Sequence, residues 1–181
     1  GLKTIKYNLN RQLTNMKLFE FGKTYKKIKG QYVEEEKMAL FSSGIFTGNS
    51  WGEEPKPVNF FYMKGVLDKI LTHFSLNSSM FENKQQDSNY TELTLSYLYN
   101  KRVVCEIGLF SKKILNAVGL RQEVYYLELN LDVLFSILKV DALNYTPVPK
   151  FPSIKRDLSL LIDDNVSYLD LQRAIDNMET S

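Results

Sequence analysis

The side chains that most often carry out catalysis or bind metals are scarce in this chain, which has one histidine, His73, and one cysteine, Cys105. A zinc site needs about four such ligands, and a Cys–His nucleophile pair needs both residues together. His73 lies beside the apolar stripe of an expected helix, and Cys105 lies in the alternating segment RVVCEIGLF. We therefore interpret both as structural residues, and the single cysteine favours a reducing cytoplasm.

Carboxylates offer a second kind of chemistry, since hard cations such as Mg²⁺ prefer carboxylate oxygens. Glu34, Glu35 and Glu36 are consecutive, and Glu53 and Glu54 precede a proline. Consecutive residues of an extended chain point to opposite sides, so we interpret both groups as parts of solvated loops. We expect no metal site and no catalytic residue in this chain.

The signatures of nucleotide chemistry are missing as well. The sequence contains neither a G-x-x-x-x-G-K-[ST] phosphate loop nor a G-x-G-x-x-G turn. Activation of a carboxylate by ATP also needs fixed cations around the triphosphate. Only five arginines are present, namely Arg11, Arg102, Arg121, Arg156 and Arg173. We therefore do not expect ATP chemistry from this chain by itself.

Positive charge is concentrated in residues 1–30, which carry eight lysines and arginines against Glu20 alone, although the whole chain has a net charge of only +2. A basic block of this kind attracts RNA phosphates, which is one interpretation. In the other, Lys26, Lys27 and Lys29 form the solvated end of a hairpin before Gly30. The sequence leaves both open.

Hydrophobic periodicity predicts the elements that would position these residues. Apolar residues at spacings of three and four predict a helix over 1–16, and alternation predicts strands over 17–25 and 38–46. The segment 60–74 has the clearest helical stripe. The polar stretch 75–89 is expected to be a connection.

The following segment predicts further antiparallel strands. Alternating runs over 90–99 and 102–110, joined by Asn100-Lys101, indicate a hairpin. A short helix is expected after Ser111, then a strand over 123–131 and a helix capped by Asp132. Together these elements predict an α+β domain whose antiparallel sheet is flanked by helices and which ends near residue 140.

The end of the chain predicts the start of a second domain. The segment NYTPVPKFPS is a proline-rich linker, and Leu158, Leu160 and Ile162 alternate as a strand. Ser167 and Asp170 have the spacing of a capping box that opens a helix. One strand and one helix cannot close a core, so we expect the chain to be a fragment of a larger subunit.

Four segments, in this order, resemble the C-terminal half of the β subunit of bacterial phenylalanine–tRNA ligase over nearly the whole chain. They are YNLNRQLTNMKLFEFGKTY (7–25), NFFYMKG (59–65), VYYLELNLDVL (124–134) and PVPKFPSIKRDLSLLIDD (147–164). The resemblance implies a catalytically inactive domain of the class II aminoacyl-tRNA synthetase fold over 1–143 and a linker over 144–152. It implies the first β–α unit of a ferredoxin-like anticodon-binding domain over 153–181.

The same resemblance implies a function for the chain. It would be a structural, tRNA-positioning part of an α2β2 phenylalanine–tRNA ligase whose α subunit charges tRNA(Phe) with phenylalanine. ATP and Mg²⁺ would serve that holoenzyme, with no cofactor bound by this fragment. The helix and strand over 1–25 would help to form the subunit interface, through Ile5, Leu9, Leu13, Phe19 and Phe21.

Contact with tRNA would come from three basic residues at the entry to the second domain, Lys150, Lys155 and Arg156. Pairing of Arg156 with Asp157 is the competing role. In this family a histidine–proline element often follows the strand that here reads VVCEIGLF, and this sequence departs from it by continuing SKKILNAVG. No segment approaches the roughly 20 apolar residues that span a bilayer, so we expect a cytoplasmic protein without a membrane partner.

Overall fold

The computed structural model describes residues 1–28, 30–46, 54–88, 90–138, 157, 159, 161–163 and 166–179. The chain divides into two compact units, Gly1–Lys139 and Val140–Ser181, which are described separately. That the second unit begins an anticodon-binding domain stays a prediction.

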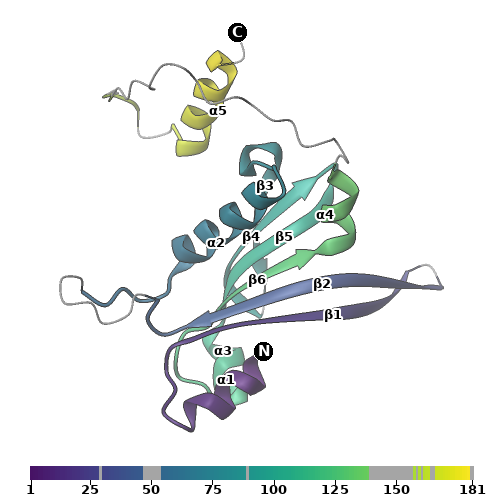
Figure 1. Cartoon of the computed structure of the whole chain (residues 1–181), viewed down its shortest axis with the longest axis vertical. Coiled ribbons are helices and arrows are strands. Elements are labelled where there is room, and N and C mark those ends of the chain that lie inside the picture. Colours follow the sequence, from purple (N-terminus) through teal and green to yellow (C-terminus); the bar gives the residue numbers. More distant parts are fainter. Residues whose placement is uncertain are drawn as a thin grey trace. The chain divides into compact units, whose positions relative to one another are not determined.

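The first unit is built on one six-stranded sheet in which every neighbouring pair is antiparallel (Figure 1). The order across the sheet is β1-β2-β6-β5-β4-β3. The strands are β1 (Met16–Ile28), β2 (Gln31–Ser43), β3 (Glu82–Ser88), β4 (Thr91–Tyr99), β5 (Arg102–Phe110) and β6 (Tyr125–Asn130). The predicted antiparallel sheet is thus confirmed.

Helices α2 (Phe60–His73) and α4 (Leu131–Ile137) pack on one face of this sheet, as their contacts with the central strands show. Met63, Leu67 and Leu71 of α2 are buried against the face that carries Leu127 and Leu129 of β6. This is the main core, and it confirms the helix predicted from the apolar stripe. A 3₁₀ turn, η1 (Ser78–Met80), lies between α2 and β3.

A second, smaller core lies where α1 (Leu2–Leu9) meets α3 (Lys112–Val118). Its fully or nearly fully buried members are Ile5, Met16, Leu115, Leu120 and Val124. Both helices lie near one end of the sheet (Figure 1). The two cores together tie the N-terminal helix to the rest of the unit.

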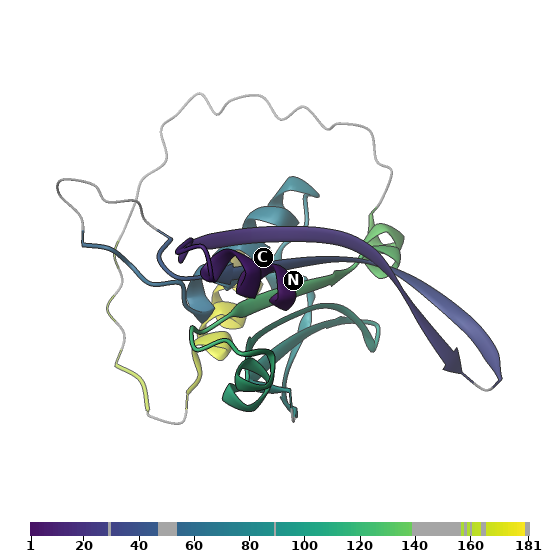
Figure 2. The same cartoon turned by 90° about the horizontal axis from the view of Figure 1, so that it is seen from below.

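The β1–β2 hairpin is longer than β6, the strand that joins it to the rest of the sheet. Strand β6 pairs only with residues 37–42 of β2. The remainder of the hairpin, residues 23–28 with 31–36, projects beyond the neighbouring strands (Figure 2). We call this projecting part the hairpin arm.

The predicted hairpin turn at Asn100-Lys101 and the predicted short helix after Ser111 are confirmed. Asn100 and Lys101 have φ values of 49° and 63°, the left-handed conformations that a tight two-residue hairpin turn needs. The Ser111 hydroxyl accepts a hydrogen bond from the Ile114 amide at 3.4 Å and caps α3. Gly119, with φ of 83°, ends that helix.

Three boundary predictions were wrong. The first helix stops at Leu9 instead of residue 16, and Met16 begins β1. Strand β2 begins at Gln31, so Glu34–Glu36 lie in a strand and not in a loop. The polar stretch 75–89 contains strand β3, which alternation of apolar residues did not reveal because β3 is a polar edge strand.

The cap of α4 was also assigned to the wrong residue. The Asn130 side chain accepts a hydrogen bond from the Val133 amide at 3.0 Å, so Asn130 is the N-cap. Asp132 lies in the first turn, where its Oδ2 accepts a hydrogen bond from the Glu36 amide at 2.9 Å. Asp132 therefore joins α4 to the hairpin arm and does not cap the helix.

In the second unit, helix α5 (Tyr168–Glu179) is preceded by the predicted capping box. The Asp170 amide donates to Ser167 Oγ at 3.3 Å, and the Ser167 amide donates to Asp170 Oδ2 at 3.2 Å. Of the predicted strand, Leu158 and Leu160 lie outside the described residues. The described positions around them, 157, 159 and 161–163, form no strand.

Candidate functional site

The sheet has one apolar and one polar face, because successive residues of a strand point to opposite sides. Leu127 and Leu129 face the main core under α2 and α4, so Glu128 between them faces the other way. Register places Glu128 directly opposite Glu106 of β5 and next to Ala39 of β2. We call this side the polar sheet face.

Charges on the polar sheet face are unevenly balanced. Lys37 Nζ pairs with Glu128 and lies 3.8 Å from Glu35 Oε2. Glu106 accepts a hydrogen bond from the Ser96 hydroxyl at 3.2 Å. No lysine or arginine of the described residues forms an ion pair with Glu106.

A pocket of about 610 Å³ on the polar sheet face, which we call the charged pocket, is lined in part by Lys37, Glu106 and Glu128. Its lining contains five carboxylates, Glu34, Glu35, Glu106, Glu128 and Asp132. Three cations, Lys26, Lys37 and Arg102, accompany them. A triphosphate needs an excess of cations, so the charge of this pocket opposes nucleotide binding.

The structure places the predicted interface residues in different environments. Ile5 is 0% exposed and belongs to the second core, so we correct its assignment from interface to core. Leu9 is half-buried against the same core. Leu13 lies beyond the end of α1 and is 55% exposed.

The other two predicted interface residues form an exposed aromatic surface. Phe19 is 69% exposed and Phe21 is 65% exposed, and their rings meet edge to face with centroids 5.9 Å apart. Tyr25, which has the same strand parity, is also exposed. Exposed aromatic residues in a row are typical of a surface that meets another macromolecule.

An apolar groove of about 540 Å³ begins at Phe21 and continues between α2 and α4. Phe74 and Phe135 meet in it edge to face, with ring centroids 6.2 Å apart. Spacing along the sequence could not reveal this groove, because its walls come from strands and helices that are far apart in sequence. His73 also lines it, and the pattern had indicated only that His73 borders an apolar stripe.

The basic block at the N-terminus is partly neutralised by the hairpin. Lys23 pairs with Glu34 and Lys26 pairs with Glu35 across the two strands of the hairpin arm. The hydrogen bond and charge of Glu34 raise the pKa of Lys23 above its usual value. This pairing supports the solvated-hairpin interpretation of the block.

Two further predictions concern Cys105 and the tRNA contacts. Cys105 is buried in the main core, and burial raises the pKa of its thiol well above the usual value, as expected for a structural cysteine. Lys150, Lys155 and Arg156 lie outside the described residues, so their role stays a prediction.

Within the ranges that the structure describes, no three or more His, Cys, Asp or Glu side chains are grouped to hold a metal ion. The helices in that part of the chain are also too short or too polar to cross a membrane.

Comparison with solved structures relates the fold to that of an aminoacyl-tRNA synthetase. The pyrrolysyl-tRNA synthetase from Desulfitobacterium hafniense matches with a TM-score of 0.55 and 16% sequence identity, over 75% of this chain and 46% of that one. At this identity the likeness concerns the fold alone.

Curated relatives extend the comparison to the sequence. The phenylalanine–tRNA ligase beta subunit of Bacteroides fragilis is 30% identical over 184 residues, which cover 96% of this chain and 22% of the relative. That of Bacillus licheniformis is 30% identical over 177 residues, with the same coverage. The chain thus spans about a fifth of the length of these relatives. The sequence profile described as "Phenylalanyl tRNA synthetase beta chain CLM domain" matches residues 1–131. With the fold and the sequence in agreement, the chain belongs to the phenylalanyl-tRNA synthetase beta chain family.

Proposed function

We propose that this chain is a non-catalytic part of the β subunit of a cytoplasmic phenylalanine–tRNA ligase. In this proposal it supports the α subunit of an α2β2 assembly, which charges tRNA(Phe) with phenylalanine using ATP and Mg²⁺. The observation that carries the proposal is the charge of the polar sheet face. The charged pocket there has more carboxylates than cations, which is unsuited to a triphosphate.

The interactions of the cations in that pocket point in the same direction. Lys37 is already paired with Glu128, and Lys26 with Glu35. A phosphate would have to displace these carboxylates before it met either ammonium group. These ion pairs support the proposal that the α subunit carries out the chemical step, as does the scarcity of arginine in the sequence.

The surface proposed for the α subunit is the aromatic row Phe19 and Phe21 together with the apolar groove beside Phe21. Aromatic side chains at the centre of an interface contribute much of its binding free energy. Leu9 and Leu13 extend the proposed surface toward α1, whereas buried Ile5 supports it only by holding α1 in place.

The second unit is proposed to begin a ferredoxin-like anticodon-binding domain. Lys150, Lys155 and Arg156 would meet tRNA phosphates through charge at its entry. Helix α5 with its capping box is consistent with this proposal. The alternative, an autonomous RNA-binding module in the N-terminal block, is weakened by the pairing of Lys23 and Lys26 with glutamates.

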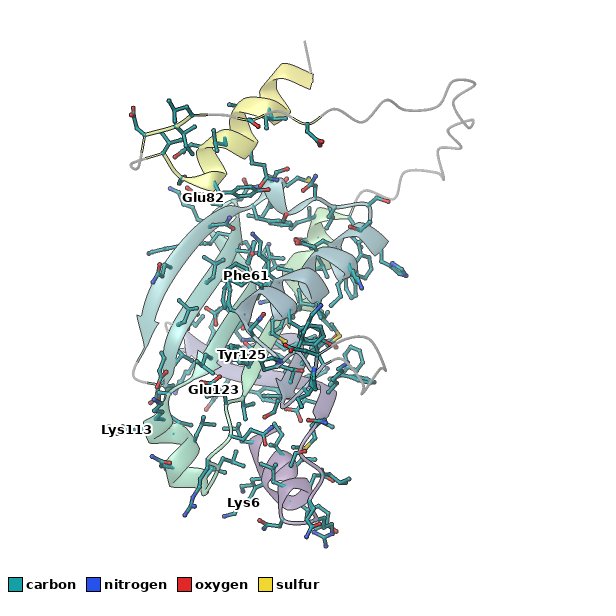
Figure 3. The ribbon with its side chains drawn as sticks, turned by 90° about the vertical axis from the view of Figure 1, so that its left-hand side faces the viewer. Lys6, Phe61, Glu82, Lys113, Glu123 and Tyr125 are labelled. Atoms are coloured by element: carbon teal, nitrogen blue, oxygen red, sulfur yellow. The ribbon has the colours of Figure 1, made fainter. Side chains whose placement is uncertain are left out.

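The test is sedimentation velocity of the 181-residue chain mixed with the α subunit. We expect a stoichiometric complex that the double substitution Phe19→Ser, Phe21→Ser weakens by at least about tenfold. Phe61→Ser is the matched control, since Phe61 (labelled in Figure 3) is 78% exposed on α2 and does not line the apolar groove.

Two outcomes would contradict the proposal. Equal weakening by Phe61→Ser and the double substitution would remove the aromatic row from the interface. ATP–pyrophosphate exchange by the chain without an α subunit would refute its non-catalytic role. Circular dichroism must show that each variant remains folded.

A further inference from the structure

A second cavity on the polar sheet face, of about 360 Å³, has a different lining from the charged pocket. We call it the aromatic pocket, and its lining residues are Ala39, Phe41, Tyr90, Thr91, Thr94, Glu106, Phe110, Tyr126 and Glu128. It thus combines four aromatic rings with two carboxylates and the hydroxyls of two threonines and two tyrosines. Its lining, as described, contains no lysine or arginine.

The aromatic wall is held in place by ring contacts. The rings of Phe41 and Phe110 are stacked with centroids 6.4 Å apart, and those of Phe110 and Tyr126 are 4.8 Å apart. Gly108 lies opposite Tyr126 in the register, and a Cβ at Gly108 would lie 2.5 Å from Tyr126 Cε1. The absence of a side chain at Gly108 therefore lets the Tyr126 ring lie against β5.

The floor of the aromatic pocket carries uncompensated negative charge. Glu106 and Glu128 are direct cross-strand neighbours, an arrangement that is unfavourable for two like charges. Lys37 pairs with Glu128, which leaves Glu106 with the Ser96 hydroxyl as its hydrogen-bond partner. A cation that entered the pocket would relieve this imbalance.

We propose that the aromatic pocket binds a primary ammonium group of a linear aliphatic polyamine. An ammonium group has three donors and no acceptor, which suits the Glu106 carboxylate and the Thr94 hydroxyl. Its methylene chain would lie against the aromatic rings, where cation–π attraction adds to apolar contact. An anion would be repelled, and a neutral apolar ligand would cover the half-buried Glu106 without giving it a charged partner.

The neighbouring charged pocket favours a polyamine over a monoamine. Glu106 and Glu128 line both pockets, so the two cavities adjoin along the sheet. Asp132, whose Oδ2 accepts a hydrogen bond from the Glu36 amide, also lines the charged pocket, whereas Glu35 is already paired with Lys26 and Lys37. A second ammonium group several ångströms from the first would therefore also meet a carboxylate. This proposal does not depend on the function proposed above.

The test is isothermal titration calorimetry of the 181-residue chain with spermidine, at constant ionic strength. We expect Glu106→Gln to weaken binding by at least about tenfold, because a hydrogen bond to a charged group is lost. Glu82→Gln is the matched control: it removes the same charge from β3, toward the opposite end of the sheet from Glu123 and Tyr125 (Figure 3).

A second variant keeps the test independent of folding. Tyr90 is exposed at the pocket rim, so Tyr90→Ala should leave the circular dichroism spectrum unchanged while weakening spermidine binding several-fold. Propylamine should bind more weakly than spermidine. Equal binding of spermidine to wild type, Glu106→Gln and Glu82→Gln, or equal competition by Mg²⁺ at the same charge concentration, would overturn the proposal in favour of unspecific counterion binding.

Discussion

The contact of Gly108 with Tyr126 leads to a stability prediction in which two glycine-to-alanine substitutions have opposite signs. A Cβ at Gly108 would lie 2.5 Å from Tyr126 Cε1 and 2.7 Å from the Leu93 carbonyl oxygen. A Cβ at Gly65, within helix α2, would meet nothing within 4 Å. Gly108→Ala should therefore destabilise the fold, and Gly65→Ala should stabilise it.

The magnitudes follow from the two environments. Overpacking of this kind costs about 1–3 kcal/mol, and the lower chain entropy of alanine in the unfolded state returns about 0.4–1 kcal/mol. We expect a net loss of about 1–2 kcal/mol for Gly108→Ala, because the Leu93 backbone cannot easily move away. In a helix interior alanine is favoured over glycine by about 0.8–1.0 kcal/mol, which is the expected gain for Gly65→Ala.

Thermal unfolding followed by circular dichroism would measure both effects. At about 2–4 °C per kcal/mol for a chain of this size, Gly108→Ala should lower Tm by about 2–8 °C and Gly65→Ala should raise it by about 2–4 °C. A Tm for Gly108→Ala equal to or above that of wild type would refute the close approach of Tyr126 to β5. The aromatic pocket would then lose one of its walls.

Four other predictions follow. Ile5→Ala should cost about 2–4 kcal/mol in urea unfolding, because Ile5 is fully buried in the second core. A loss under about 0.5 kcal/mol, as is usual for surface substitutions, would contradict its burial. Asn59→Ala should cost about 1 kcal/mol, because the Asn59 side chain accepts a hydrogen bond from the Tyr62 amide at 2.8 Å and so caps α2. An unchanged urea midpoint would contradict that cap. Cys105 should react with a thiol reagent only as fast as the chain unfolds, and a fast reaction in native buffer would show that it is not buried. Burial raises the pKa of Tyr125 to about 12, above an unfolded value of about 10. The stability that the neutral Tyr125 contributes is therefore fully present below about pH 10 and declines as the pH rises toward about 12. Tyr125→Phe should lessen the loss of stability between these two pH values, as measured by urea unfolding.

Periodicity predicted the elements whose own burial sets their pattern. Helix α2 and the β4–β5 hairpin were found because apolar residues recur on the side of each element that packs into the main core. Strand β3 was missed because it lies at the sheet edge with a polar sequence. The first helix was extended too far because Leu13 and Met16 continue its spacing, although Gln12, with φ of 65°, turns the chain out of the helix.

The candidate site could not be predicted from the spacing of residues along the sequence, because it depends on strand register and tertiary packing. Glu106 and Glu128 face each other only because β5 and β6 pair in one particular register. Ile5 and Phe19 are both apolar residues of one segment, yet one is in the core and the other is exposed. That difference is decided by α3, which covers α1 and comes about a hundred residues later.

The strand order has a consequence for how the sheet is assembled. The β1–β2 hairpin and the β3–β4–β5 meander each join strands that are neighbours in sequence. They come together only through β6, whose Glu128 is 91 residues from its partner Lys37. Closing such a loop costs entropy before any contact repays it, so each half can form early while their union waits for β6. During synthesis, the sheet would remain open between β2 and β5 until residue 130 had left the ribosome.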